Sequence, residues 1–163
     1  MVHRIGVLLV TLLTAVLLGG CASGSSQSAG DRLDFTAKTL DGRPFAGESL
    51  AGKPAVLWFW APWCPACQGE APTVAKVAAA NPLVTFVGVG ARDELPAMKA
   101  FATKYGIDKF TELADTDATV WAKFGVTRQP AYAFLSPDGA VEVVKGSLPE
   151  EELTERVAAL AQR

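Results

Sequence analysis

One apolar segment that runs directly into a pair of cysteines most constrains the fold of this chain. Residues Ala55–Trp60 read AVLWFW, and Cys64 and Cys67 follow just where a helical pattern begins at Pro65. A run of six apolar residues has no polar face, which is typical of a central strand covered on both sides. The sequence therefore predicts a buried strand that delivers a Cys-Pro-Ala-Cys motif to the start of a helix.

Two hairpins and a second buried strand are expected around this segment. Residues 33–47 read LDFTAKTLDGRPFAG and predict a short hairpin whose turn is Asp41-Gly42. The continuous apolar segment Leu83–Gly90 predicts a buried strand. The segments AYAFLS and AVEVVKG flank the turn 137–139 and predict a second hairpin.

The helices are expected between these strands and at the C-terminal end. The helix from Pro65 should kink at Pro72, whose ring does not fit a helix interior. A second helix is expected to be capped by Asp93, to run through Tyr105 and to end at Gly106. A short helix is expected over residues 117–124, after FTELAD. The last helix should begin with a capping box of Ser147 and Glu150, and its apolar face consists of Leu153, Val157 and Leu160. Strands joined through helices predict a parallel centre, and the late hairpin adds antiparallel strands. The pattern thus indicates an α/β domain of three layers with a mixed sheet.

The first thirty residues have the composition of an export signal and a linker. Arg4 precedes a largely apolar stretch, Ile5–Leu18, that is short for a membrane span, so residues 1–20 predict a signal peptide. The segment LGGC ending at Cys21 resembles the lipobox of bacterial lipoproteins, in which the cysteine is lipidated. A simple cleavable signal, in which Cys21 has no role, is the alternative. Residues 21–30 then predict a flexible tether rich in glycine and serine, and residues 31–163 a single domain.

The charge balance argues against a nucleic-acid partner. The chain has 15 lysine and arginine residues against 17 aspartate and glutamate residues, and the two signs are mixed along the sequence. A nucleic-acid-binding surface would require a basic stripe. We therefore expect no nucleic-acid partner.

The spacing of the cysteines indicates redox chemistry. Disulfides persist outside the cytoplasm, and a bridge between Cys64 and Cys67 would close too small a loop to stabilise the fold much. The N-terminus of a helix presents unpaired N–H groups and a partial positive charge, which stabilise a thiolate. We therefore expect Cys64 to be the exposed N-cap nucleophile, with Pro65 at the first helical position. Cys67, one turn on, would resolve the mixed disulfide.

Other uses of the two cysteines need partners that the sequence lacks. Zinc, copper and Cys–His hydrolase sites require further ligands or a base, but the one histidine, His3, lies in the expected signal. Haem attachment requires a histidine where Gln68 stands, and a peroxidase would usually have a threonine where Ala61 stands. We therefore expect no metal and no cofactor. Two inert buried thiols remain the structural alternative.

The segment AGKPAVLWFWAPWCPACQGEAP resembles the active-site segment of the thioredoxin superfamily, in its exported TlpA/ResA/DsbE-like branch. The later segments FATKYGIDKF and VWAKFGVTRQPAYAFLSPDGAVEVVKG match that branch in order and spacing, so the resemblance covers nearly all of residues 31–160. With the lipobox, the chain is most similar to an actinobacterial lipoprotein of this branch. The resemblance implies a thioredoxin-like three-layer α/β/α fold with a mixed central sheet and an N-terminal β-hairpin.

The resemblance also implies roles for individual residues. Cys64 matches the attacking cysteine of the family and Cys67 the resolving one. Trp63 matches the tryptophan beside the active site. A packed aromatic is the alternative interpretation, and one residue could serve both purposes. Pro130 matches the cis-proline that faces the disulfide and pairs with substrate backbone, and Gln129 before it would border the substrate groove.

The chain departs from thioredoxins at the position of their buried acid. That acid stands six residues before the first cysteine, where this chain has Trp58. Glu70, three residues after Cys67, matches a glutamate of the branch and is the candidate proton acceptor for the resolving thiol. The alternative is a solvated glutamate favoured in the first turn by the helix dipole.

The dipeptide between the cysteines is intermediate between those of oxidants and reductants. The dipeptide Pro65-Ala66 carries neither the histidine common in strong oxidants nor the Gly-Pro of thioredoxin-like reductants. The resemblance favours a disulfide donor to exported proteins with cysteine thiols, recharged by a membrane quinone-linked thiol oxidase. It would sit lipid-anchored on the outer face of the cell membrane, or also be secreted. A reductase of the ResA/CcmG type, acting in cytochrome c maturation, is one alternative, and a non-catalytic peptide-binding module is another.

Overall fold

The structure, a computed structural model, describes residues 29–163. The expected signal peptide, Cys21 and most of the tether lie outside the described residues. The fold begins with helix α1 (Ala29–Leu33), so the last two residues of the expected tether belong to a helix. No helix in this described part of the chain is long and apolar enough to cross a membrane.

The centre of the molecule is a five-stranded mixed sheet. Its strands follow the order β5-β4-β3-β6-β7, in which β3, β4 and β5 are parallel and β6 and β7 are antiparallel to their neighbours. The strands are β3 (Ala55–Trp60), β4 (Thr85–Ala91), β5 (Thr111–Asp115), β6 (Ala131–Leu135) and β7 (Val141–Lys145). The predicted mixed sheet is confirmed, and β3 has the predicted bounds.

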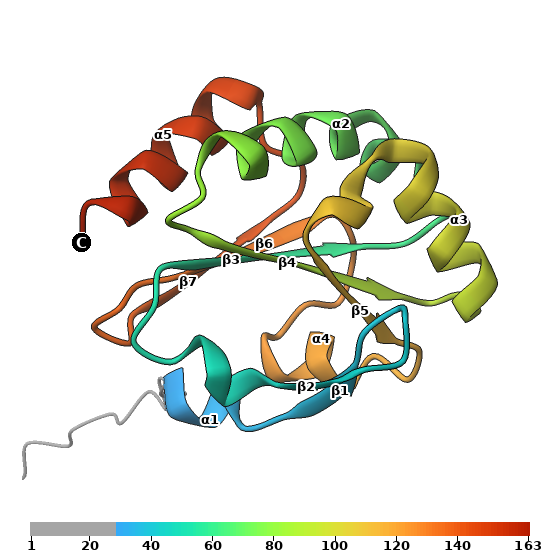
Figure 1. Ribbon diagram of the computed structural model, residues 1–163, viewed down its shortest axis with the longest axis horizontal. Helices are drawn as coiled ribbons and strands as arrows, with labels where there is room; N and C mark the ends of the chain where they lie inside the picture. The colour runs from blue at the N-terminus through green and yellow to red at the C-terminus, as the bar shows by residue number, and fades with distance from the viewer. Residues whose placement is uncertain (1–28) are drawn as a thin grey trace, which may run out of the picture.

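Helices cover both faces of the sheet, so the predicted three-layer α/β/α fold is confirmed. Helices α2, α3 and α5 lie on one face, whereas α1, α4 and the small sheet lie on the other (Figure 1). Their bounds are α2 (Pro65–Ala80), α3 (Leu95–Tyr105), α4 (Thr119–Lys123) and α5 (Glu150–Ala161), with 3-10 turns η1 (Gly47–Leu50) and η2 (Ile107–Lys109). Helix α2 continues through Pro72. Helix α3 ends at Gly106, as predicted, and this glycine is in the left-handed conformation.

Strand β3 contributes side chains to two separate cores. Because successive side chains of a strand point to opposite faces, Val56, Trp58 and Trp60 pack with α2, α3 and α5. Leu57 and Phe59 pack on the other face, against α1 and α4. The absence of a polar face in this segment follows from its position between two layers of helices.

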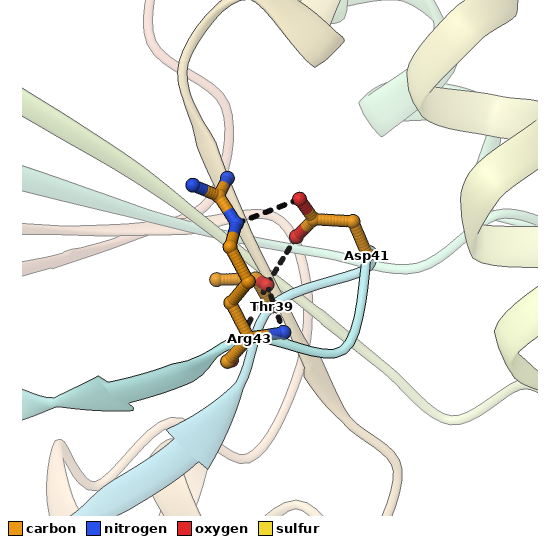
Figure 2. A network of polar contacts seen from close by, with 3 residues as sticks. All are labelled: Thr39, Asp41 and Arg43. Carbon is orange, nitrogen blue, oxygen red and sulfur yellow. Dashed lines mark hydrogen bonds and ion pairs between the residues drawn. The ribbon is translucent and has the colours of Figure 1, made fainter.

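The N-terminal hairpin was predicted and is present as β1 (Thr36–Lys38) and β2 (Pro44–Ala46). Figure 2 shows the polar contacts that fix its turn: the Thr39 hydroxyl donates to Asp41, and Arg43 Nε donates to the other Asp41 oxygen over 2.7 Å. The Thr39 hydrogen bond, with help from Arg43, holds the pKa of Asp41 below its usual value. The tip of the hairpin reaches β5, because the Leu40 amide donates to the Glu112 carbonyl over 2.8 Å.

Strand β5 was missed by the sequence analysis, which placed no strand at FTELAD. Its acidic residues Glu112 and Asp115 interrupt the apolar pattern, yet both are buried. Asp115 accepts hydrogen bonds from the first amides of α4, at Val120 (3.0 Å) and Trp121 (2.9 Å). The Glu112 carboxyl lies over Gly88 of β4, where a side chain would collide with it. Contacts made only in the folded chain therefore explain this strand.

Both predicted side-chain caps are wrong. The residue before α3 is Glu94, and Asp93 instead accepts a hydrogen bond from the Glu94 amide over 2.8 Å. Helix α5 has Pro149 as its N-cap, two residues later than a capping box at Ser147 requires. The chain stays extended there, and Leu148 is buried in the core beneath α5.

Candidate active site

The two cysteines lie at the junction between β3 and α2, as predicted. Cys64 is the N-cap of α2, and its sulfur accepts a hydrogen bond from the Cys67 backbone N–H over 3.2 Å. Pro65 occupies the first turn, where its missing N–H costs no helical hydrogen bond. Both thiols are free in this structure. The helix thus places an N–H donor on the sulfur of Cys64 and holds Cys67 one turn away.

The burial of Cys64 differs from the expectation. Only 5 % of Cys64 and none of Cys67 is accessible, so the predicted exposed Cys64 is wrong. The reason is packing, because both residues belong to the core between the sheet and α2. Trp63 is 52 % exposed and is the prominent side chain beside Cys64. A substrate must therefore dock closely at this edge to reach the sulfur.

The environment of Cys67 favours its neutral thiol. Burial raises the pKa of Cys67 well above its usual range, and interaction with Cys64 and the charge of Glu70 act in the same direction. At neutral pH this residue therefore carries its proton. A group that takes up or supplies that proton is required when Cys67 reacts.

Glu70 is such a group by position. It is 8 % exposed, and its Oε1 accepts hydrogen bonds from Tyr132 Oη at 2.7 Å and from Trp58 Nε1 at 3.1 Å. Burial raises the pKa of Glu70, and these hydrogen bonds oppose the shift. The alternative of a solvated first-turn glutamate is therefore wrong. Thioredoxins have a buried acid at the position of Trp58, whereas here the Trp58 indole donates a hydrogen bond to Glu70, an acid from α2.

The segment before β6 lies at the same end of the sheet. The Gln129–Pro130 peptide bond is cis, as the resemblance implied. Ala131 pairs with Phe59 of β3. The segment that enters β6 and the segment that leaves β3 toward Cys64 therefore lie side by side at this end of the sheet. Gln129 is half-buried, and within residues 29–163 its buried Oε1 has no hydrogen-bond partner.

Two features of this region were missed by the sequence analysis. Trp63 Nε1 donates to the carbonyl of Arg92 over 3.0 Å, and no sequence pattern marks Arg92. Trp60 Nε1 donates to Glu112 over 2.9 Å, which gives a second buried pair of an indole and a carboxyl. The indoles of Trp58 and Trp60 stack, with ring centroids 6.1 Å apart. The alternation of side chains along β3 could have placed both tryptophans on one face of the sheet. It could not have predicted that they bind the carboxyl groups of Glu70 and Glu112.

Comparison with known proteins identifies the family. The family model named Redoxin matches residues 28–161, which is most of the chain. The chain belongs to the Redoxin family.

Relatives of this Redoxin protein narrow the subgroup. The soluble secreted antigen MPT53 of Mycobacterium tuberculosis is 46 % identical over 158 residues, which cover 95 % of this chain and 91 % of the relative. ResA, a thiol-disulfide oxidoreductase of Bacillus subtilis, is 29 % identical over 157 residues, which cover 90 % and 86 %. The predicted ResA/DsbE-like branch is therefore confirmed.

Solved structures agree with this placement. The structure of DsbF from Mycobacterium tuberculosis is 65 % identical, with a TM-score of 0.79 and coverage of 80 % of this chain and 97 % of that one. A secreted Mycobacterium tuberculosis disulfide oxidoreductase homologous to Escherichia coli DsbE is 52 % identical, with a TM-score of 0.76 and coverage of 79 % and 98 %. The Redoxin protein described here is thus a thiol-disulfide oxidoreductase of the DsbE/ResA type.

Proposed function

We propose that this protein is a disulfide donor that oxidises cysteine thiols of exported proteins. The observation that carries the proposal is the hydrogen bond from the Cys67 amide to the Cys64 sulfur at the start of α2. A donor at this position stabilises a Cys64 thiolate, and stabilising the reduced form makes the disulfide a stronger oxidant. The neutral dipeptide Pro65-Ala66 adds no charge that would oppose this effect.

The reaction consists of two exchanges. A substrate thiolate attacks the sulfur of Cys64, the Cys64–Cys67 bond breaks, and Cys67 leaves with the electron pair and gains a proton. A second substrate thiolate then attacks the substrate sulfur of the mixed disulfide, and Cys64 leaves as the thiolate. The substrate dithiol becomes a disulfide, and the protein disulfide becomes two thiols.

Glu70 is proposed to exchange the proton of Cys67. Burial raises the pKa of its carboxyl, so it can hold a proton in the oxidised protein and give it to the departing Cys67 sulfur. In the reverse direction the carboxylate accepts that proton. The hydrogen bonds from Tyr132 and Trp58 both reach Oε1. We propose that the other carboxyl oxygen, the buried Oε2, makes this exchange.

Trp63, Gln129 and Pro130 are proposed to bind the substrate. The exposed indole of Trp63 stands on one side of Cys64, and the cis-proline segment lies at the same edge of the sheet. An extended substrate segment would lie between them and pair with backbone near Pro130, as added strands do in peptide recognition. The half-buried amide of Gln129 would offer that segment a hydrogen-bond acceptor.

We also propose where the protein acts. Residues 1–20 would direct export, Cys21 would carry the lipid, and residues 21–28 would connect the anchor to α1. The domain would then work on the outer face of the cell membrane, and its relative MPT53 is named as a soluble secreted protein. Regeneration of the disulfide would require a thiol oxidase in the membrane that passes electrons to quinones.

The reduction potential of the Cys64–Cys67 pair tests the direction. Equilibration with glutathione buffers, followed by alkylation of free thiols, gives the potential directly. A value between about −120 and −180 mV is expected for a disulfide donor. A value of about −270 mV, typical of thioredoxin-like reductants, would refute the proposal and favour a thiol reductase of the ResA/CcmG type. A Cys64→Ser variant that still supports oxidation of its substrates in cells would instead indicate a peptide-binding module.

A further inference from the structure

Arg92 lies where three segments of the active-site edge meet. It directly follows β4, and its backbone carbonyl accepts the hydrogen bond from Trp63 Nε1 at 3.0 Å. Its guanidinium donates to the carbonyl of Thr127 over 2.7 Å. The guanidinium also lies over the ring of Trp121, 5.3 Å from the ring centroid. One residue therefore connects the cysteine loop, the end of β4 and the segment that precedes the cis-proline.

The backbone of Arg92 is strained. Its φ is 61°, in the left-handed region that residues with a side chain avoid. Such a conformation persists where surrounding contacts determine it, and it is over-represented at functional sites. Here the contacts are those made by its own carbonyl and guanidinium, both directed at the active-site edge.

The segment held by the guanidinium has few other anchors. Val126 and Pro130 are buried, whereas Thr127 and Arg128 between them are exposed. Among the described residues, the hydrogen bond from Arg92 is the one that reaches the backbone of residues 127–129. The position of the chain that enters Pro130 therefore depends on this contact.

We propose that Arg92 is a positioning residue for substrate binding. Through its carbonyl it fixes Trp63, and through its guanidinium it fixes the Thr127 carbonyl, so the two sides of the substrate groove keep a constant separation. An extended peptide then binds a groove that is already ordered, and its binding does not have to order the segment first. The role is the same for oxidation and reduction, because both directions pass through the same mixed disulfide with Cys64.

Two variants separate the side chain from the backbone of Arg92. Arg92→Gly accepts the left-handed conformation and keeps the carbonyl that binds Trp63, but it lacks the guanidinium. Arg92→Asn also tolerates this conformation and serves if the glycine variant does not fold. Arg92→Lys keeps the positive charge without the planar fork. Arg128→Ala is the matched control, because it removes an exposed positive charge from the same segment without breaking a described contact.

The assay is the single-turnover reduction of the oxidised full-length protein by an excess of an extended dithiol peptide, or by dithiothreitol. The peptide concentration at half-maximal rate reports binding, and the maximal rate reports chemistry. For Arg92→Gly we expect the former to rise about fivefold, as for loss of one exposed charge-assisted hydrogen bond, with the maximal rate within about twofold. The rate with dithiothreitol should not change, and Arg92→Lys should recover part of the loss.

Three results would overturn this role. An unchanged half-saturating peptide concentration in Arg92→Gly or Arg92→Asn would show that the guanidinium does not position the groove. Equal losses with the peptide and with dithiothreitol would show a general effect on the cysteines. A loss of the same size in Arg128→Ala would assign the effect to charge and not to position.

Discussion

Replacement of Glu112 by glutamine should change how the stability of this protein depends on pH. Glu112 is 5 % exposed, its Oε2 accepts from Trp60, and within the described residues its buried Oε1 has no hydrogen-bond partner. Burial raises the pKa of Glu112 well above its usual value, the Trp60 hydrogen bond opposes the shift, and the charge of Asp108 adds to it. The folded protein therefore retains a proton that the unfolded chain releases near pH 4.5.

The sign and size of the effect follow from proton linkage. Between pH 4.5 and the raised pKa of the folded state, unfolding releases this proton, so the free energy of unfolding falls as the pH rises. The loss is about 1.4 kcal/mol for each pH unit over which the folded protein stays protonated. Glutamine cannot titrate, so the variant lacks this loss. As the pH rises, the unfolding free energy of Glu112→Gln minus that of the wild type should therefore increase by about 1.4 kcal/mol per pH unit.

Urea unfolding from pH 5 to pH 8, followed by tryptophan fluorescence with the cysteines kept reduced, measures this difference. Glu70 and Asp115 also have raised pKa values, but they contribute to both proteins and cancel. Glu155→Gln, an exposed change on α5, is the control and should give a difference that does not vary with pH. A pH-independent difference for Glu112→Gln as well would refute the assignment of a protonated Glu112 in the folded protein.

Three further perturbations test the site and its support. In the reverse direction, in which Cys67 attacks the mixed disulfide at Cys64, Glu70→Gln should slow this step about 10²-fold, because the carboxylate that accepts the Cys67 proton is lost. Mass spectrometry should then detect accumulated mixed disulfide, and resolution at the wild-type rate would contradict the role of Glu70. Tyr132→Phe removes the 2.7 Å hydrogen bond that stabilises the Glu70 carboxylate, so the pKa of Glu70 should rise further. The pH–rate profile of resolution should then shift to higher pH. An unchanged profile would contradict the dependence of this step on the Tyr132–Glu70 hydrogen bond. Gly88→Ala should destabilise the protein by about 1–3 kcal/mol in urea unfolding, because its methyl group would collide with the Glu112 carboxyl, and wild-type stability would contradict this packing.

The sequence was sufficient where the information is local. The apolar run 55–60 and the cysteine spacing placed β3, the N-cap Cys64 and the start of α2, because each depends on neighbouring residues. The cis bond before Pro130 came from the family resemblance, since X-Pro bonds are mostly trans. The resemblance also made Glu70 a candidate proton acceptor, whereas its burial could be seen only in the fold.

The features that were missed depend on distant parts of the chain. Glu112 is buried because Gly88 makes room for it and Trp60 binds it, and none of these residues is near another in sequence. Arg92 adopts a conformation that local preference disfavours, and the contacts that hold it come from Trp63 and Thr127. Hydrophobic periodicity contains no information about such pairs.

The burial of both sulfurs also bears on the chemical lifetime of the protein. Peroxide converts accessible thiolates to sulfenic and then to irreversible sulfinic and sulfonic acids, at rates that follow thiolate character and exposure. Cys67 is inaccessible and held as a neutral thiol, and Cys64 presents only a small surface. A sulfenic acid formed on Cys64 would meet Cys67 one helical turn away and condense to the disulfide. Accidental oxidation would therefore leave the pair as a disulfide, which thiol–disulfide exchange can reduce again, and would not destroy it.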